Sequence, residues 1–221
     1  MYFCIEMCYF DFHHHHLGVR DGIFNASLEN TPHEMLISLG IHPMEIPPNW
    51  EEAFDKIKEK AQLANCVAIG ECGLDVRSNA SIMLQKEVFH AHLEWANTLG
   101  KPMIIHCVKQ YDALIPFRKK AKVPMVIHGF NKNKNLAMDL VRHGFLLSFG
   151  TQLTHSSSLQ ETLKAMPEDA FFLETDAKDM PISQVYTTAA QVLGKSEQWM
   201  KDRIKENLIN LGIHDKLVRE K

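Results

Sequence analysis

Several features that would narrow the class of this protein are missing from its sequence. No apolar run reaches the roughly 20 positions that a membrane-spanning helix needs, and residues 1–10 lack the basic start of a signal peptide. The five cysteines are odd in number and show no disulfide-framework spacing. A reducing compartment is therefore expected, and we predict a cytoplasmic protein without a membrane partner.

A strongly basic surface and any internal repeat, linker or low-complexity segment are also lacking. The 24 Lys and Arg residues are outnumbered by 27 Asp and Glu, which gives a net charge of −3. This balance argues against a surface that coats nucleic acid, although an enzyme can still bind phosphates through metal ions and a few local cations. We expect one domain, residues 1–221, in which residues 1–6 are a dispensable extension. The oligomeric state stays open, and a monomer is compatible with the sequence.

Short apolar runs alternate with helical patterns along the chain. The predicted strands are 9–12, 22–26, 35–41, 66–70, 102–105, 124–127, 145–150 and 170–173. The predicted helices are 49–65, 81–99, one that contains Pro116, 133–143, 155–165, 183–193 and 196–211. Too few residues separate the first two strands for a helix. The pattern predicts a parallel α/β fold, a reduced (β/α)8 TIM-type barrel with a truncated first βα unit.

Residues of metal-ligand type stand at the ends of several predicted strands. Glu71 directly follows the strand 66–70. The alternative explanations are a Glu paired with a nearby Arg or Lys, and a plain loop carboxylate at a strand exit. Further candidates follow other strands, namely His13 and His15, His106, His128, and Asp176. In a barrel the carboxyl ends of the strands meet at one rim, so these side chains are expected to be neighbours.

Six ligands are too many for one tetrahedral site with an open position, but they suit two ions that share a carboxylate. Imidazole and carboxylate ligands together favour Mg²⁺, Mn²⁺ or Zn²⁺. Four consecutive histidines leave two registers open, because ligands two apart share a face of a strand: His13 with His15, or His14 with His16. Cys72 and Cys107 directly follow candidate ligands and are expected to be packing residues. His90 and His92 are expected on or near the solvated side of the helix 81–99, with no chemical role.

The motifs, taken in order, resemble the TatD family of metal-dependent deoxyribonucleases. They are Asp11-Phe12-His13-His14-His15, Gly40-Ile41-His42-Pro43, Ile69-Gly70-Glu71-Cys72-Gly73-Leu74-Asp75, Ile105-His106, Ile127-His128-Gly129-Phe130 and Leu173-Glu174-Thr175-Asp176. The resemblance implies a barrel of the amidohydrolase type and DNA as the substrate. It implies one metal held by His13, His15 and Asp176. It implies a second metal held by His106 and His128, with Glu71 bridging the two and Asp176 taking a proton from the attacking water.

The family pattern Asp-x-His-x-His, read forward from Asp11, selects His13 and His15. The pattern often has an apolar residue after the second His, and placing Leu17 there selects His14 and His16 instead. We favour the first register because Asp11, two residues before His13, would lie on the same face of a regular strand. From there it could support the site from below. His14 is then expected to point toward the surrounding helices, and His16 to belong to the following loop.

The sequence also departs from the family. Val108 and Lys109 stand where an Arg is common, and Ala177-Lys178-Asp179 separates the last motif from the usual proline. Lys109 and His42 are assigned to substrate binding, with a structural loop histidine as the alternative for His42. Further candidate phosphate contacts are Arg77, Lys132 and Lys134. These departures leave two rival hypotheses: a hydrolase of a small amide, lactone or phosphoester, and a metal-binding pseudoenzyme that serves as an interaction module.

Overall fold

The computed structural model describes residues 9–213, so the predicted extension 1–6 lies outside the described residues. Its strands form one parallel eight-stranded sheet in which each strand pairs with the next along the chain. The strands are β1 Asp11–His14, β2 Gly22–Ala26, β3 Leu36–Leu39, β4 Cys66–Asp75, β5 Met103–Val108, β6 Met125–Ile127, β7 Leu146–Phe149 and β8 Phe171–Leu173. A parallel bridge between His14 and Asp176 joins the first strand to the end of the last and closes the barrel.

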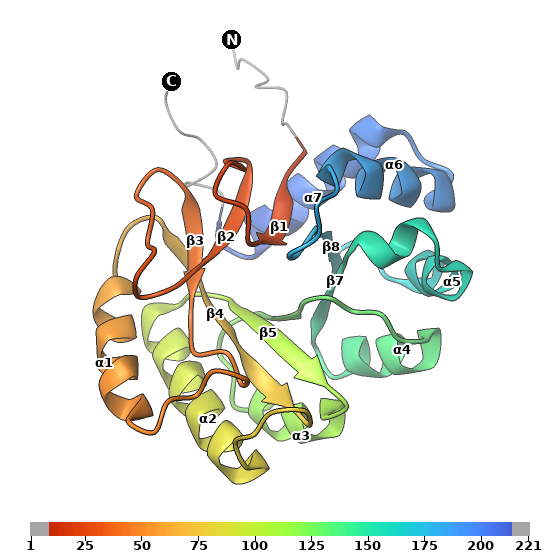
Figure 1. Ribbon diagram of the computed structural model, residues 1–221. Coiled ribbons are helices and arrows are strands. Elements are labelled where there is room, and N and C mark those ends of the chain that lie inside the picture. Colours follow the sequence, from red (N-terminus) through yellow and green to blue (C-terminus); the bar gives the residue numbers. More distant parts are fainter. Residues whose placement is uncertain (1–8, 214–221) are drawn as a thin grey trace.

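Helices surround the barrel on the outside, as Figure 1 shows. They are α1 Trp50–Lys60, α2 Ile82–Leu99, α3 Tyr111–Arg118, α4 Lys134–Arg142, α5 Ser157–Ala165, α6 Ile182–Leu193 and α7 Glu197–Asn210, with a 3₁₀ turn at Thr151–Thr154. The prediction of a reduced barrel is confirmed. Neither the β1–β2 nor the β2–β3 connection contains a helix, and α1 is the first helix of the described chain, as predicted.

The longest helix shows how the local sequence sets the element boundaries. The Ser81 side chain accepts a hydrogen bond from the Leu84 N–H, which caps the start of α2. Gly100 ends the helix in the left-handed conformation, with φ of 65°. The Asn49 side chain does not cap α1 but donates a hydrogen bond to the Glu52 carboxylate, and the helix ends five residues before the predicted end.

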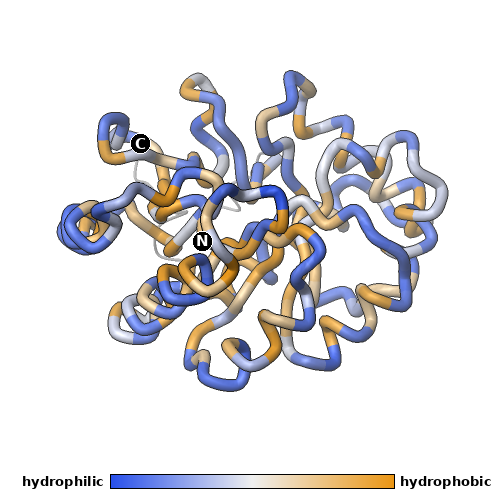
Figure 2. The backbone as a smooth tube through the Cα atoms, turned by 60° about the horizontal axis from the view of Figure 1, so that its bottom comes forward, coloured by the Kyte–Doolittle hydropathy of each residue, from blue (hydrophilic) through white to orange (hydrophobic). Residues whose placement is uncertain are grey.

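The core lies inside the barrel and between the sheet and the helices. Figure 2 shows hydrophobic segments concentrated toward the centre of the trace and hydrophilic segments on the outer helices and loops. Phe12 of β1 stacks on Phe172 of β8 with ring centroids 4.3 Å apart. Cys72 and Cys107 are buried, as predicted for packing residues. None of the described helices is long and apolar enough to cross a membrane.

The prediction for His92 was wrong, whereas His90 is exposed as expected. The His92 side chain is fully buried; its Nε2 accepts a hydrogen bond from the Ile41 N–H at 2.9 Å, and its Nδ1 donates to the Val88 carbonyl at 2.7 Å. Burial lowers the pKa of His92 to about 4, so the ring is neutral at pH 7. His92 thereby fixes the backbone next to His42, a task that helical periodicity alone does not reveal.

Candidate metal centre

Glu71 lies within β4, which continues past the predicted end at Gly70 as far as Asp75. The strand accommodates Glu71 through an irregularity, because positions 69 to 72 of β4 pair with positions 103 to 105 of β5. Gly70 and Gly73 have φ of 140° and 154°, and a Cβ at Gly73 would collide with the carbonyl oxygen of His106. These two glycines therefore allow β4 to approach β5 closely and to turn Glu71 inward.

Three imidazoles converge on one carboxylate oxygen of Glu71. The Oε1 atom lies 2.9 Å from His106 Nδ1, 2.8 Å from His128 Nε2 and 3.2 Å from His42 Nε2. His106 lies within β5, His128 follows β6 and His42 lies in the loop after β3, and the Glu71 side chain is 6% exposed. A buried carboxylate oxygen surrounded by imidazole nitrogens places a candidate bridging ligand beside candidate nitrogen ligands.

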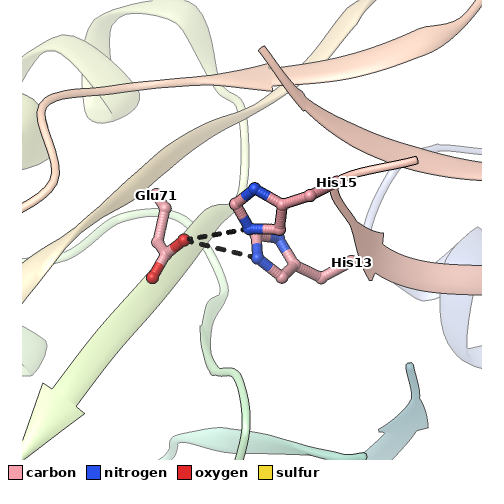
Figure 3. A group of neighbouring side chains, drawn as sticks. All are labelled: His13, His15 and Glu71. Atoms are coloured by element: carbon pink, nitrogen blue, oxygen red, sulfur yellow. Dashed lines mark ion pairs between the residues drawn. The ribbon is translucent and has the colours of Figure 1, made fainter. Parts of the chain in front are cut away.

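His13 and His15 face the other oxygen of Glu71, as Figure 3 shows. Their Nε2 atoms lie 3.4 and 3.8 Å from Glu71 Oε2. The same atoms lie 3.8 and 3.4 Å from Asp176 Oδ1. His14 packs beside Phe24 of β2, and His16 lies in the following loop with its ring on the Lys178 carbonyl. The structure thus brings together His13 and His15, and it places His14 against β2 where we predicted the surrounding helices.

Asp176 closes this side of the site at the end of β8. Its backbone adopts the left-handed conformation with φ of 56°, which is costly for a residue other than glycine and is typical of functional positions. Burial alone would raise the pKa of its carboxyl, but a hydrogen bond from His15 and the charges of other histidines hold that pKa below its usual value. The carboxylate is 41% exposed and faces the rim.

The charges of the cluster are mutually dependent. Burial alone would raise the pKa of the Glu71 carboxyl, but the surrounding histidines, led by His128, outweigh burial and hold that pKa well below its usual range. Burial alone would lower the pKa of His128, and the charge of Glu71 raises it instead. Glu71 is therefore a buried anion, and a buried anion requires a compensating positive charge.

Two carboxylates that the sequence analysis left without a role hold the histidines in place. The Asp75 Oδ2 atom lies 2.8 Å from His106 Nε2, and the Arg77 guanidinium donates hydrogen bonds to both oxygens of the same carboxylate. Glu174 Oε1 lies 3.4 Å from His128 Nδ1 and accepts the Gly129 N–H at 2.7 Å. Both residues belong to motifs at strand ends. In the sequence they appear as second acidic residues close to the predicted ligands Glu71 and Asp176.

Further polar groups fasten these elements. The Gln85 amide accepts the Asp75 N–H at 2.8 Å and donates to the Asp75 carbonyl at 3.1 Å, which attaches α2 to the end of β4. Asn25 of β2 accepts the Glu71 N–H at 3.1 Å and donates weakly to the Glu71 carboxylate at 3.4 Å. The helix and the neighbouring strand therefore hold the backbone on both sides of the cluster.

Asp11 does not support the His13 ring from below, so this expectation was wrong. Its carboxylate accepts hydrogen bonds from the Thr175 N–H, at 2.9 Å, and from the Thr175 hydroxyl. The cause is an irregularity in β1, where positions 11 to 14 pair with positions 22 to 24, so one extra residue breaks the alternation between Asp11 and His13. Burial raises the pKa of Asp11 to about 7, although the Thr175 hydrogen bonds oppose this. Asp11 thus fixes the residue beside Asp176.

A cleft of about 660 Å³ opens over the cluster, and its lining includes His15, Glu71, His106, His128, Asp176 and His42. His42 lies at the site, as predicted, with its ring 4.4 Å from the His106 ring. Lys109 is exposed directly after β5 with φ of 56° and does not line the cleft. The structure therefore brings His42 to the cluster and leaves Lys109 outside it.

The residues present fit a metal centre. Three groups of side chains each bring their ligand atoms within 4.8 Å of one another: His13, His15 and Glu71; His13, His128 and Asp176; and His42, Glu71 and His106. His13 is fully buried, yet neither ring nitrogen has a hydrogen-bond partner in the described part of the chain. Buried polar atoms are nearly always satisfied, so an unpaired imidazole that faces two carboxylates indicates a place for a cation.

Comparisons with known proteins find metal-dependent hydrolases among the relatives of this chain. Among curated proteins, the "uncharacterized metal-dependent hydrolase" of Buchnera aphidicola subsp. Baizongia pistaciae is 36% identical over 149 residues, which cover 65% of this chain and 56% of that protein. The "3'-5' ssDNA/RNA exonuclease TatD" of Enterobacter lignolyticus is 26% identical over 196 residues, which cover 78% of this chain and 75% of that protein. The aligned part thus spans less than two thirds of the Buchnera protein.

A solved structure shares the fold. The crystal structure of YjjV, a TatD homologue from Escherichia coli K12, superposes with a TM-score of 0.81 at 20% identity and covers 93% of this chain and 98% of that one. Residues 23–211 match the family described as "TatD related DNase". The match includes four of the five strand ends that form the cluster, and the chain belongs to the TatD-related DNase family.

Proposed function

We propose that this chain is a metal-dependent hydrolase that binds two divalent ions and cleaves phosphodiester bonds at the ends of nucleic acid strands. The observation that carries the proposal is the convergence of histidines and carboxylates from five strand ends on the buried Glu71. The printed name of the Enterobacter relative, a ssDNA/RNA exonuclease, supports nucleic acid as the substrate class.

The proposed ligands divide between two ions that share one carboxylate. They are His13, His15 and Asp176 for one ion, His106 and His128 for the other, and Glu71 for both. When bound, such ions activate a water molecule at neutral pH and stabilise the charge that develops on a phosphate. Mg²⁺, Mn²⁺ and Zn²⁺ all accept this mixture of imidazole and carboxylate.

The protein's own groups have distinct tasks in this proposal. Asp176 is ionised and partly exposed at the rim, so its carboxylate accepts the proton of the attacking water. The ring of His106 is held between Glu71 and Asp75, which leaves Nδ1 as its ligand atom. The ring of His128 is held by Glu174 at Nδ1, which leaves Nε2. The opposite carboxylates thus fix the orientation of both rings before substrate arrives.

Phosphate contacts come from cations around the rim. Lys109, Lys132 and Lys134 are exposed after strand ends, whereas Arg77 is held on Asp75 and therefore has less freedom to reach a substrate. We expect binding of single-stranded DNA to weaken as salt rises, because cation–phosphate contacts release counterions. Substituting Lys109 by Ala should reduce the salt slope by about one unit at most.

The central experiment combines metal analysis with a substrate panel. Purified protein is analysed for bound metal, freed from metal with a chelator, and reloaded with Mg²⁺, Mn²⁺ or Zn²⁺ before it is assayed. The expected result is release of nucleotides from the ends of single-stranded DNA or RNA. Turnover of a small ester, lactone or amide without nuclease activity would favour the small-molecule hydrolase, and metal binding without any turnover would favour the pseudoenzyme.

A second experiment tests the shared ligand. Replacing Glu71 by Gln keeps the shape of the side chain but removes the charge that offsets two cations, so the occupancy of both ions should fall. Glu161, an exposed residue of α5 that pairs with Lys164, provides the matched control as Glu161→Gln. Loss of one ion with full retention of the other would make Glu71 a ligand of a single ion.

A further inference from the structure

The cleft extends away from the metal centre as an arm between the β2–β3 connection and α1. The arm is lined by Leu28, Glu29, Glu45, Pro47, Ala53 and Ile57. The β2–β3 connection, residues 27–35, carries no helix, so this side of the barrel rim is bordered only by loops and α1. The arm is therefore a consequence of the reduced architecture of this chain.

The chemistry of the arm is apolar with an acidic edge. Glu29 and Glu45 are exposed residues that line the arm, while its other walls carry aliphatic side chains and proline. Among the described residues that line the cleft, none is Lys or Arg. The Lys60 ammonium lies close by, but it donates to the Leu28 carbonyl and the Thr31 hydroxyl and does not line the cleft.

Such a surface favours binding of an uncharged nucleoside and disfavours binding of a phosphate group. A nucleobase and its sugar offer apolar faces and hydroxyls, which suit the aliphatic walls. A terminal phosphate monoester carries a charge of about −1.5 to −2 at pH 7, close to the charge of a phosphoserine, and the two carboxylates repel it. The phosphodiester that is cleaved carries a smaller charge and lies over the metal centre, away from the acidic edge.

We propose that the arm binds the terminal nucleoside of the strand and that Glu29 and Glu45 select ends with a free hydroxyl over ends with a phosphate. This inference rests on the proposed cleavage of nucleic acid ends. Two carboxylates screened by solvent, acting on a dianion, are expected to slow cleavage of phosphate-terminated strands by about fivefold to tenfold at low salt. The preference should shrink as the salt concentration rises.

The test uses four single-stranded oligonucleotides of one sequence that carry a hydroxyl or a phosphate at each end. The end at which degradation begins is identified from the product ladder, and the rates are compared for that end. The wild-type protein should prefer the hydroxyl end by about fivefold to tenfold. In the double variant Glu29→Gln/Glu45→Gln this ratio should fall to about two or less, mainly through faster cleavage of the phosphate-terminated strand.

A matched control and a binding measurement complete the test. Glu87 and Glu94 are exposed on α2, so Glu87→Gln/Glu94→Gln changes the net charge equally and should leave the ratio unchanged. Fluorescence anisotropy with chelator-treated protein measures the affinity for labelled trinucleotides with either end, independently of turnover. Equal rates for both ends in the wild type, or an equal shift in the control, would overturn the inference. Failure to cleave any nucleic acid would instead overturn the proposed function, and the binding ratio would still test the arm.

Discussion

Asp75 offers the sharpest test of how the metal centre is held. Its carboxylate is fully buried, lies 2.8 Å from His106 Nε2 and is gripped by the Arg77 guanidinium at 2.6 Å. Burial alone would raise the pKa of Asp75, but the hydrogen bonds from Arg77 and His106 hold it well below its usual value. Asp75 is therefore an anion that fixes the orientation of His106 and makes its other nitrogen more basic.

We predict that Asp75→Asn lowers metal affinity by about 10- to 100-fold, the range typical of carboxylates that orient a ligating histidine. This loss corresponds to about 1.4–2.7 kcal/mol of binding free energy. The amide can still accept a hydrogen bond from the ring, so the shape of the site should persist and the change isolates the charge. Arg77 is 63% exposed and stays solvated without its partner.

The assay is competition for Zn²⁺ or Mn²⁺ between the protein and a chromogenic chelator. The Asp139–Arg142 pair on α4 repeats the Asp–Arg contact at 3.0 Å on the surface, so Asp139→Asn provides the control. Thermal melting of chelator-treated protein measures any general loss of stability separately. An affinity for metal within about threefold of the wild type would refute the argument, and so would an equal loss in the control.

Three further predictions follow from the geometry. His13→Ala should lower metal affinity strongly in the chelator assay and His14→Ala only slightly; the reverse order would shift the register by one residue. His92 has a pKa of about 4 in the fold and about 6.5 when unfolded, so acid protonates the unfolded chain first, and stability should fall by about 2 kcal/mol between pH 7 and pH 5. In denaturant titrations His92→Gln should lose less unfolding free energy between pH 7 and pH 5 than the wild type. An equal loss in both proteins would contradict the lowered pKa of His92. Gly73→Ala should cost at least 1–3 kcal/mol of unfolding free energy, because its Cβ meets the His106 carbonyl; an unchanged melting temperature would show that β4 can shift.

The sequence predicted the barrel and the neighbourhood of the ligands because both follow from regular rules. Alternating strands and helices determine the order of the elements, and parallel strands bring their carboxyl ends to one rim. His13 and Glu71 could therefore be placed together from their positions at strand ends. Strand alternation left both histidine registers open, and the family pattern Asp-x-His-x-His selected His13 and His15, which face Glu71.

What could not be predicted depends on local departures from those rules. An extra residue in β1 removed Asp11 from the face of His13, and the irregularity at Gly70 carried β4 on to Asp75. Neither is encoded by hydrophobic periodicity, because a bulge depends on the pairing of two strands. The burial of His92 likewise depends on a tertiary partner, the Ile41 N–H, which no helical pattern specifies.

The closure of the barrel gives the metal centre a second significance. The first and last strands meet through backbone hydrogen bonds from the Asp176 N–H to His13 and from the His15 N–H to Asp176, and Asp11 joins Thr175 across 164 residues of sequence. A cation held by His13, His15 and Asp176 would act as a cross-link between distant parts of the chain. Cross-links over loops of this length restrict the unfolded ensemble by several kcal/mol, about 4–5 for a disulfide. Removal of the cation should therefore destabilise the junction between β1 and the end of β8 first. Amide hydrogen exchange should then be faster at His15 and Asp176 than in β4 to β6.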